Sequence, residues 1–302
     1  MKNYDLIIIG GGPAGLTAGI YALRGGLSAL IVEREAPGGQ ILKTQNIENY
    51  PGVESVAGYE LATTMLKQTE SLGCQFKYNE VKSVQLNDKI KRLEFSSGDK
   101  LETKNMIIAT GARPKMLNVT GEKEFTGRGV SYCATCDGNF YKGKTVVVVG
   151  GGNTAVYDAI FLSNIAAKVY LVHRRCALRA EKILVDSLKS RENVVFLLDS
   201  VIERIIGDDK VNSLTIKNVL NNETRALSTD GIFIAIGQSP QSELFVSVNK
   251  DEYGYIITDS EMKTNSDGVY AIGDVRAKSL RQIVTACADG AIAVSDIIKK
   301  KI

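Results

Sequence analysis

Two cysteines separated by two residues, Cys133 and Cys136, are the side chains best suited to redox chemistry in this sequence. A C-x-x-C pair can be half of a zinc site, a redox dithiol or two neighbouring core residues. Zinc needs two further ligands, and the remaining cysteines (Cys74, Cys176 and Cys287) are isolated. We therefore expect no metal site, and a pair that interchanges between dithiol and disulfide by thiolate attack.

The residue after the pair could take part in the same chemistry. Asp137 follows Cys136 directly and precedes Gly138. Its carboxyl group could donate or accept the proton when a thiolate forms or leaves. It could equally cap a turn through its side chain, and the residues alone favour neither interpretation. Cys176 and Cys287 are expected to be small buried hydrophobic residues.

A glycine-rich turn near the start of the chain could hold the pyrophosphate of a dinucleotide. Gly10, Gly12 and Gly15 stand between an apolar run and a helical stretch. Gly10 permits a tight turn, Gly12 lets the backbone approach a phosphate, and the helix N-terminus offers unpaired N–H groups. Glu33 ends the next apolar run, where a carboxylate can accept hydrogen bonds from ribose hydroxyls.

A second turn repeats the first but changes its charge. Gly150 and Gly152 lie 140 positions after Gly10 and Gly12, and the position equivalent to Glu33 is His173. Three arginines follow it closely: Arg174, Arg175 and Arg179. Guanidinium groups bind a 2′-phosphate through charge-assisted hydrogen bonds, whereas a carboxylate would repel it. The second turn is therefore predicted to bind NADPH.

The elements around the turns also repeat. Asp5–Gly12 resembles Thr145–Gly152, and each copy continues through a helix into a second apolar strand. Both copies end on an apolar strand followed by a glycine and a proline, in Met106–Pro114 and Gly231–Pro240. Apolar runs of this length are typical of strands buried on both faces of a parallel sheet.

These repeats predict an α/β fold of two Rossmann-like, three-layer domains, the second inserted into the first. The first would consist of residues 1–113 and 242–302, and the second of residues 114–241. The stretches 81–95 and 201–219 are expected to be antiparallel hairpins.

The composition limits the partners. The 302 residues carry a formal net charge of +3, so no basic face for nucleic acid is expected. No run approaches the roughly 20 apolar residues of a membrane span. The N-terminal apolar run is too short for a signal peptide, and we expect a cytoplasmic protein without a membrane partner.

In order and spacing the motifs resemble the low-molecular-weight thioredoxin reductases of bacteria. The resemblance is carried by Gly10–Gly15, Cys133–Gly138, Gly150–Ala155, His173–Arg175 and Gly273–Val275, and it covers essentially the whole chain. It implies FAD in the first domain, NADPH in the second, thioredoxin as the partner and a homodimer. Where the family often has an aromatic residue after Asp-Gly, this chain has Asn139.

The resemblance also implies the cofactor contacts. Those to FAD are Gly10, Gly12, Pro13, Ala14, Gly15, Glu33, Gly39, Gln40, Asn49, Val81, Thr110, Gly111, Gly273, Asp274, Arg281 and Gln282. Those to NADPH are Gly152, Asn153, Thr154, His173, Arg174, Arg175, Arg179, Ile236 and Gly237.

The resemblance further implies how the cysteines work. Cys136 would lie nearest the flavin, Cys133 would attack the partner disulfide, and Asp137 would be the acid–base residue. The second domain would rotate about hinges near residues 112–115 and 238–242, which is a general device for alternating access.

Four other functions fit part of this pattern. A related reductase could act on a low-molecular-weight disulfide or a peroxidase system. A ferredoxin–NADP reductase of this fold would not need the cysteine pair, and a ferredoxin-driven reductase would not need the arginines. An FAD-binding redox sensor would leave the arginines unexplained.

Overall fold

The computed structural model describes residues 4–44, 46–86 and 89–301. The chain forms two compact units, residues 1–113 with 239–302 and residues 114–238. The chain therefore leaves the first unit once and returns to it once.

The first unit is built around one large sheet. Its helices are α1 (Pro13–Arg24), α2 (Gly58–Ser71) and α6 (Ile283–Lys301), with 3-10 turns η1 (Gly39–Lys43) and η3 (Gly273–Val275). Its strands are β1 (Tyr4–Ile9), β2 (Ala29–Glu33), β3 (Gln75–Tyr78), β4 (Val81–Gln85), β5 (Lys91–Phe95), β6 (Lys100–Ile108) and β17 (Val269–Ala271).

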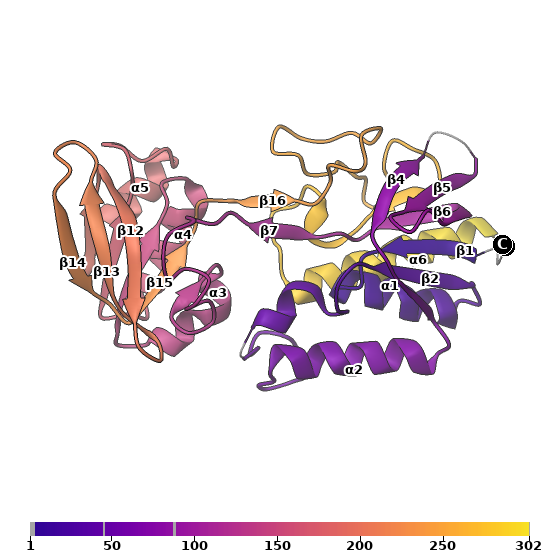
Figure 1. Cartoon of the computed structure of the whole chain (residues 1–302), viewed down its shortest axis with the longest axis horizontal. Helices are drawn as coiled ribbons and strands as arrows, with labels where there is room; N and C mark the ends of the chain where they lie inside the picture. The colour runs from indigo at the N-terminus through magenta and orange to yellow at the C-terminus, as the bar shows by residue number, and fades with distance from the viewer. Residues whose placement is uncertain (1–3, 45, 87–88, 302) are drawn as a thin grey trace. The chain divides into compact units, whose positions relative to one another are not determined.

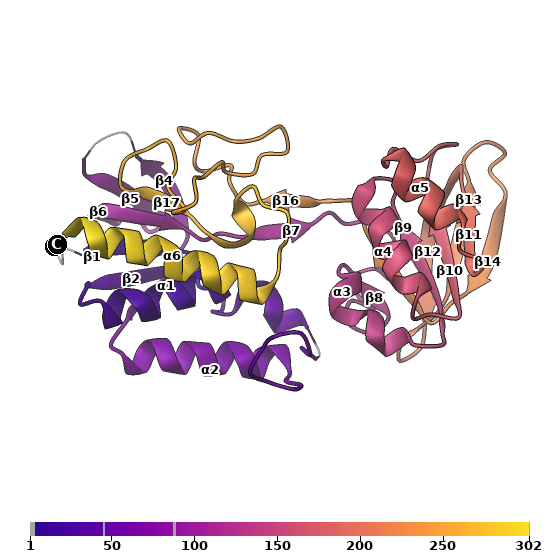
Figure 2. The same ribbon diagram turned by 180° about the vertical axis from the view of Figure 1, so that it is seen from behind.

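The sheet has the order β3-β2-β1-β6-β5-β4, and β17 also pairs with β6. Strands β1, β2, β3, β6 and β17 are parallel, whereas β4 and β5 form the expected antiparallel hairpin. Helices α1, α2 and α6 cover one face (Figures 1 and 2). The other face is covered by side chains of β5 and of the segment before β17. Because both faces are covered, the central strands are apolar throughout.

The second unit has two sheets. A parallel sheet has the order β11-β10-β9-β15-β8, and an antiparallel sheet has the order β12-β13-β14. The strands of the parallel sheet are β8 (Val130–Ser131), β9 (Thr145–Val149), β10 (Lys168–Val172), β11 (Val194–Leu197) and β15 (Gly231–Ile234). Those of the antiparallel sheet are β12 (Ser200–Gly207), β13 (Val211–Asn218) and β14 (Thr224–Ser228).

Helices cover the face of the parallel sheet that the antiparallel sheet leaves open (Figure 2). They are α3 (Ala134–Asp137), α4 (Asn153–Ser163) and α5 (Lys182–Lys189), with the 3-10 turn η2 (Gly138–Tyr141). The expected hairpin at residues 201–219 is confirmed by the antiparallel pairing of β12 and β13.

The two connecting segments pair with each other as β7 (Ala112–Pro114) and β16 (Gln238–Pro240). Backbone hydrogen bonds flank the pair, from Lys115 N to the Gly237 carbonyl at 3.0 Å and from Gln241 N to the Gly111 carbonyl at 2.9 Å. The predicted fold class is confirmed: two Rossmann-like α/β domains, the second inserted into the first.

Candidate functional site

The cysteine pair forms a disulfide in the second unit. Cys133 and Cys136 are bonded, with their Cα atoms 5.3 Å apart. Cys133 is the N-cap residue of α3, and its carbonyl accepts a hydrogen bond from Asp137 N at 3.1 Å. The short helix therefore holds both sulfurs of a potential redox disulfide within one turn of chain, just after the end of strand β8.

Asp137 is held by a neighbour that the sequence did not reveal. Ser131 donates its hydroxyl hydrogen to Asp137 Oδ2 across 2.6 Å. Although Asp137 is the N-cap residue of η2, its side chain makes no capping hydrogen bond. Burial raises the pKa of Asp137, and the Ser131 hydrogen bond partly opposes that rise. The observed geometry therefore does not use the carboxylate as a turn cap.

The first glycine turn has room at the point where a phosphate would lie. A Cβ on Gly12 would meet no atom within 4 Å, whereas one on Gly15 would collide with the Gly10 carbonyl. Gly10 has a φ of 112°, which favours glycine. Gly39 approaches the same turn, since a Cβ there would lie 3.4 Å from Gly12 Cα. The backbone is thus shaped for close approach by a ligand.

Glu33 lies beside this turn at the end of β2. Its Oε2 accepts a hydrogen bond from Gly11 N at 2.7 Å, and its Oε1 accepts one from Glu35 N at 2.8 Å. Each carboxylate oxygen can accept a second hydrogen bond. Glu33 therefore braces the turn and keeps acceptor capacity for a hydroxyl.

At η3 a second group of expected residues comes together. Asp274 Oδ1 is buried and has no hydrogen-bond partner within the described ranges. Burial raises the pKa of Asp274, and the charges of Lys278 and Arg281 oppose that rise. The Arg281 guanidinium lies 3.9 Å from the centre of the Tyr255 ring. An orphaned buried carboxylate oxygen is the kind of group that a bound ligand satisfies.

Asp289, on α6, supports that turn. Its Oδ2 accepts hydrogen bonds at 2.9 Å from both Gly273 N and Lys278 Nζ. Nearby, Asn49 donates to Gln282 Oε1 across 3.1 Å, which joins two expected contact residues 233 positions apart. Asp289 could not be predicted from the sequence, because a carboxylate inside a helix gives no sign of what it faces.

The remaining expected residues of the first unit have simpler surroundings. Pro13 and Ala14 begin α1, and Gln40 lies in η1. Val81 begins β4 and is half-buried. Thr110 donates its hydroxyl hydrogen to the Gln241 carbonyl at 2.6 Å. Gly111 has a φ of 71° just before β7.

The second glycine turn has the same openness as the first. A Cβ on Gly152 would meet no atom within 4 Å, and Gly152 is the N-cap of α4. Asn153 and Glu181 exchange two hydrogen bonds, at 2.8 and 2.9 Å, which tie the start of α4 to the start of α5. Thr154 is exposed beside them.

His173 lies under this turn. It is only 5% exposed, and a Cβ on Gly151 would collide with its ring. Its Nε2 has no partner in the part of the chain that the structure describes. Burial, followed by the charges of Arg179, Arg175 and Arg174, lowers the pKa of His173. The imidazole is therefore neutral at neutral pH and fills the space where the first turn has Glu33.

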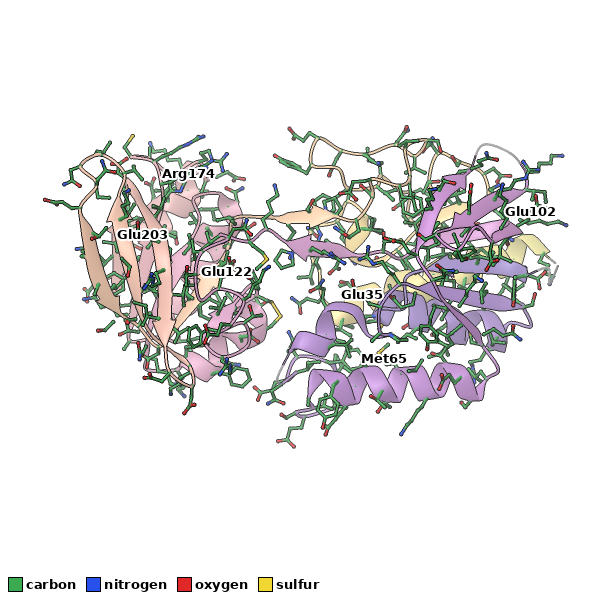
Figure 3. All side chains as sticks on the ribbon, viewed as in Figure 1. Glu35, Met65, Glu102, Glu122, Arg174 and Glu203 are labelled. Carbon is green, nitrogen blue, oxygen red and sulfur yellow. A yellow bond between two sulfur atoms is a disulfide. The ribbon has the colours of Figure 1, made fainter. Side chains whose placement is uncertain are left out.

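The arginines form an exposed cluster. Arg174, Arg175 and Arg179 are all exposed, and Arg174 is labelled in Figure 3. Arg179 is fixed to the turn by its backbone, whose N–H donates to the Gly151 carbonyl across 2.7 Å. The three exposed guanidinium groups can therefore bind an anion from solution.

The expectation for the isolated cysteines is wrong for Cys176, which is exposed. It follows the arginines in the irregular segment between β10 and α5, where no packed layer covers it. Cys287 is half-buried, and Cys74 is buried.

The last two expected NADPH contacts, Ile236 and Gly237, lie between β15 and β16, and Gly237 has a φ of 105°.

No helix in the described ranges is long and apolar enough to cross a membrane. No group of three or more potential metal-ligating side chains is found in those ranges either.

Comparison with known proteins gives consistent matches. Residues 4–290 match the family model of the pyridine nucleotide-disulphide oxidoreductases. The chain is 46% identical over 295 residues to a thioredoxin reductase of Listeria innocua, covering 97% of this chain and 92% of that protein. It is 44% identical over 298 residues to a thioredoxin reductase of Bacillus subtilis, covering 98% and 94%. The crystal structure of thioredoxin reductase from Streptococcus pyogenes superposes with a TM-score of 0.94 at 43% identity, over 99% of both chains.

Proposed function

The chain belongs to the pyridine nucleotide-disulphide oxidoreductase family, and from that premise we propose that it is a thioredoxin-disulfide reductase. Electrons would pass from NADPH through FAD to the Cys133–Cys136 disulfide and on to oxidised thioredoxin. The disulfide inside a unit that also carries a dinucleotide turn is the observation that supports this proposal best. As in the relatives, thioredoxin is the proposed partner.

The residues of the first unit fit FAD. The open space at Gly12 and the N-terminus of α1 suit a pyrophosphate, and Glu33 retains acceptor capacity for ribose hydroxyls. The orphaned Asp274 Oδ1 suits a ligand hydroxyl, which would donate the hydrogen bond that this atom lacks. The FAD contacts implied by the resemblance are therefore retained as our proposal.

The residues of the second unit fit NADPH. Gly152 and the N-terminus of α4 offer a phosphate site, and the exposed arginine cluster offers positive charge for a 2′-phosphate. His173 replaces the carboxylate that would repel that phosphate. The NADPH contacts implied by the resemblance are likewise retained as our proposal.

Bound FAD would supply the two-electron path by which the hydride of NADPH reduces the disulfide. Cleavage of the Cys133–Cys136 bond would leave two thiolates, and Asp137 would give a proton to Cys136. Cys133 would then attack the partner disulfide as a thiolate, forming a mixed disulfide and releasing one partner sulfur as a thiolate. Cys136 would return its proton to Asp137 and displace the mixed disulfide as a thiolate, so that the pair is oxidised again. Each released partner thiolate would take a proton from solvent, which gives the dithiol.

Two further parts of the proposal follow the resemblance. We propose that the paired connectors β7 and β16 are the hinge for the domain rotation that this electron path requires. We also propose that the active form is a homodimer.

The test is NADPH oxidation by the purified yellow protein with thioredoxin from the same organism as acceptor, and NADH as the comparison. We expect rapid turnover with NADPH, loss of turnover in Cys136→Ser and Cys133→Ser, and normal turnover in the matched control Cys176→Ser. A Cys136→Ser protein that reduced thioredoxin at the normal rate would end the assignment. If NADPH reduced the flavin but thioredoxin stayed oxidised, the partner would be wrong and the cofactors would stand.

A further inference from the structure

Ser131 contacts both the carboxyl group of Asp137 and the backbone of Cys133, which carries the attacking sulfur. It is the last residue of β8 and only 4% exposed. Its Oγ is 2.6 Å from Asp137 Oδ2, 3.1 Å from Cys133 N and 3.3 Å from the Cys133 carbonyl oxygen. One buried hydroxyl therefore contacts the carboxyl group and both backbone polar groups of Cys133.

The hydroxyl has one hydrogen and two possible acceptors for it. Cys133 N always donates to Ser131 Oγ, so the choice lies between Asp137 Oδ2 and the Cys133 carbonyl. When Asp137 is ionised, Ser131 donates to the carboxylate. When Asp137 is protonated, its O–H donates to Ser131 Oγ, and Ser131 turns its hydrogen to the Cys133 carbonyl. Asp137 Oδ2, Ser131 Oγ and Cys133 N each keep a hydrogen bond in both states, and Ser131 keeps its own hydrogen in each.

We propose that Ser131 is a positioning residue for proton transfer at the cysteine pair. Its hydroxyl holds the Asp137 carboxyl group against the segment that carries Cys133 in either protonation state, by reversing the direction of one hydrogen bond. This inference rests on the proposed function, since it assigns a role within that disulfide exchange.

The surroundings of Asp137 make this hydrogen bond important. Burial is the main influence on the carboxyl group and disfavours its charged form, and the Ser131 hydroxyl is the group that opposes burial. The titratable and charged groups on the neighbouring parts of the unit include Tyr132, Cys133, Cys136, Tyr141, Lys142, Lys144, Tyr157, Asp158 and Asp230. A Ser131→Ala substitution changes none of these groups, so a shift in the titration of Asp137 can be assigned to the lost hydroxyl.

The experiment is the pH profile of thioredoxin reduction by the holoenzyme carrying Ser131→Ala. We expect the limb that depends on Asp137 to move up by about one pH unit, because the charged carboxylate loses a stronger, charge-assisted hydrogen bond than the protonated acid does. NADPH-driven reduction of ferricyanide, which takes electrons directly from the flavin, should be unchanged. Ser131→Thr, which keeps a hydroxyl, should restore the normal limb.

Two controls separate this role from a structural one. Ser163→Ala removes another buried hydroxyl of the same unit, whose bond runs to the Ile160 carbonyl, and should leave the profile in place. In an Asp137→Asn background, Ser131→Ala should cause no further shift. The proposal is overturned if Ser131→Ala keeps the normal limb, or if it causes the same shift in the Asp137→Asn background.

A second readout does not need the partner. The rate at which iodoacetamide alkylates Cys133 in the reduced protein, followed against pH by mass spectrometry, reports thiolate formation. Its pH dependence should shift to lower pH in Ser131→Ala, because a carboxyl group that stays neutral to higher pH repels the forming thiolate less, and an unshifted alkylation profile would contradict the proposal. If the normal protein failed to reduce thioredoxin while Ser131→Ala still shifted the alkylation profile, the proposed partner would be wrong and the role of Ser131 would stand.

Discussion

Glu122 accepts a hydrogen bond at 2.9 Å from the hydroxyl of Tyr132, the residue directly before Cys133. The carboxylate is 1% exposed, and it also accepts hydrogen bonds from Leu117 N at 2.9 Å and Asn118 N at 2.6 Å. It thus joins the segment that follows β7 to the residue next to the cysteine pair. Its charge is held by three hydrogen bonds rather than by a cation in the described contacts.

We expect Glu122→Gln to lower the apparent free energy of unfolding by about 1–3 kcal/mol, because one acceptor oxygen becomes a donor facing an N–H or O–H group. Glu203→Gln, at an exposed position of β12, is the matched control and should change it by less than about 0.5 kcal/mol. Figure 3 labels both glutamates. Denaturant unfolding measures both variants, and equal midpoints would show that the Glu122 network adds nothing to stability.

Loss of one arginine of the exposed cluster should weaken NADPH binding selectively. Arg174→Ala is expected to raise the KM for NADPH about 10- to 100-fold, which corresponds to one or two charge-assisted hydrogen bonds. The KM for NADH should hardly change, because NADH has no 2′-phosphate. Arg225→Ala removes an exposed arginine of β14 and serves as the control. A parallel rise in both KM values would argue for a general effect on the turn instead.

Asp274→Ala is expected to reduce the affinity for FAD about tenfold or more, because a ligand hydroxyl would lose a buried carboxylate partner. The measurement is FAD content after gel filtration, together with the dissociation constant from flavin fluorescence. Asp267→Ala is the control, because Asp267 is an exposed carboxylate two residues before β17. Unchanged FAD affinity in Asp274→Ala would remove Asp274 from the proposed site.

The sequence predicted the features that depend on backbone pattern. Apolar runs followed by glycines identify the strand-turn-helix units, because a buried parallel strand and a tight turn allow few other residues. The pairing of Cys133 with Cys136 is also local, since two intervening residues keep the sulfurs close. The fold class followed from the repetition of these patterns.

The partners of polar side chains could not be predicted in the same way. Ser131 meets Asp137 only because β8 ends where α3 turns back, and neither residue carries a sign of the other. The Asp289 contact with Gly273 N depends on how α6 packs against η3. Cys176 lies in the irregular segment after β10. Without the apolar periodicity of a helix or strand, the sequence there does not indicate which side chains are buried.

Asp158 on α4 should make stability depend on pH. Burial raises its pKa to about 6, whereas an unfolded chain has a value of about 3.9. The folded state therefore binds the proton more tightly, and the contribution of this group to stability falls as pH rises from about 4 to 6 and stays low above that. Asp158→Asn should raise the free energy of unfolding by about 1–3 kcal/mol at pH 8 and by less at pH 5. Asp186→Asn, exposed on α5, is the control. Denaturant unfolding at both pH values is the measurement, and a gain that is the same at pH 5 and pH 8 would mean that the Asp158 carboxyl does not titrate in this range.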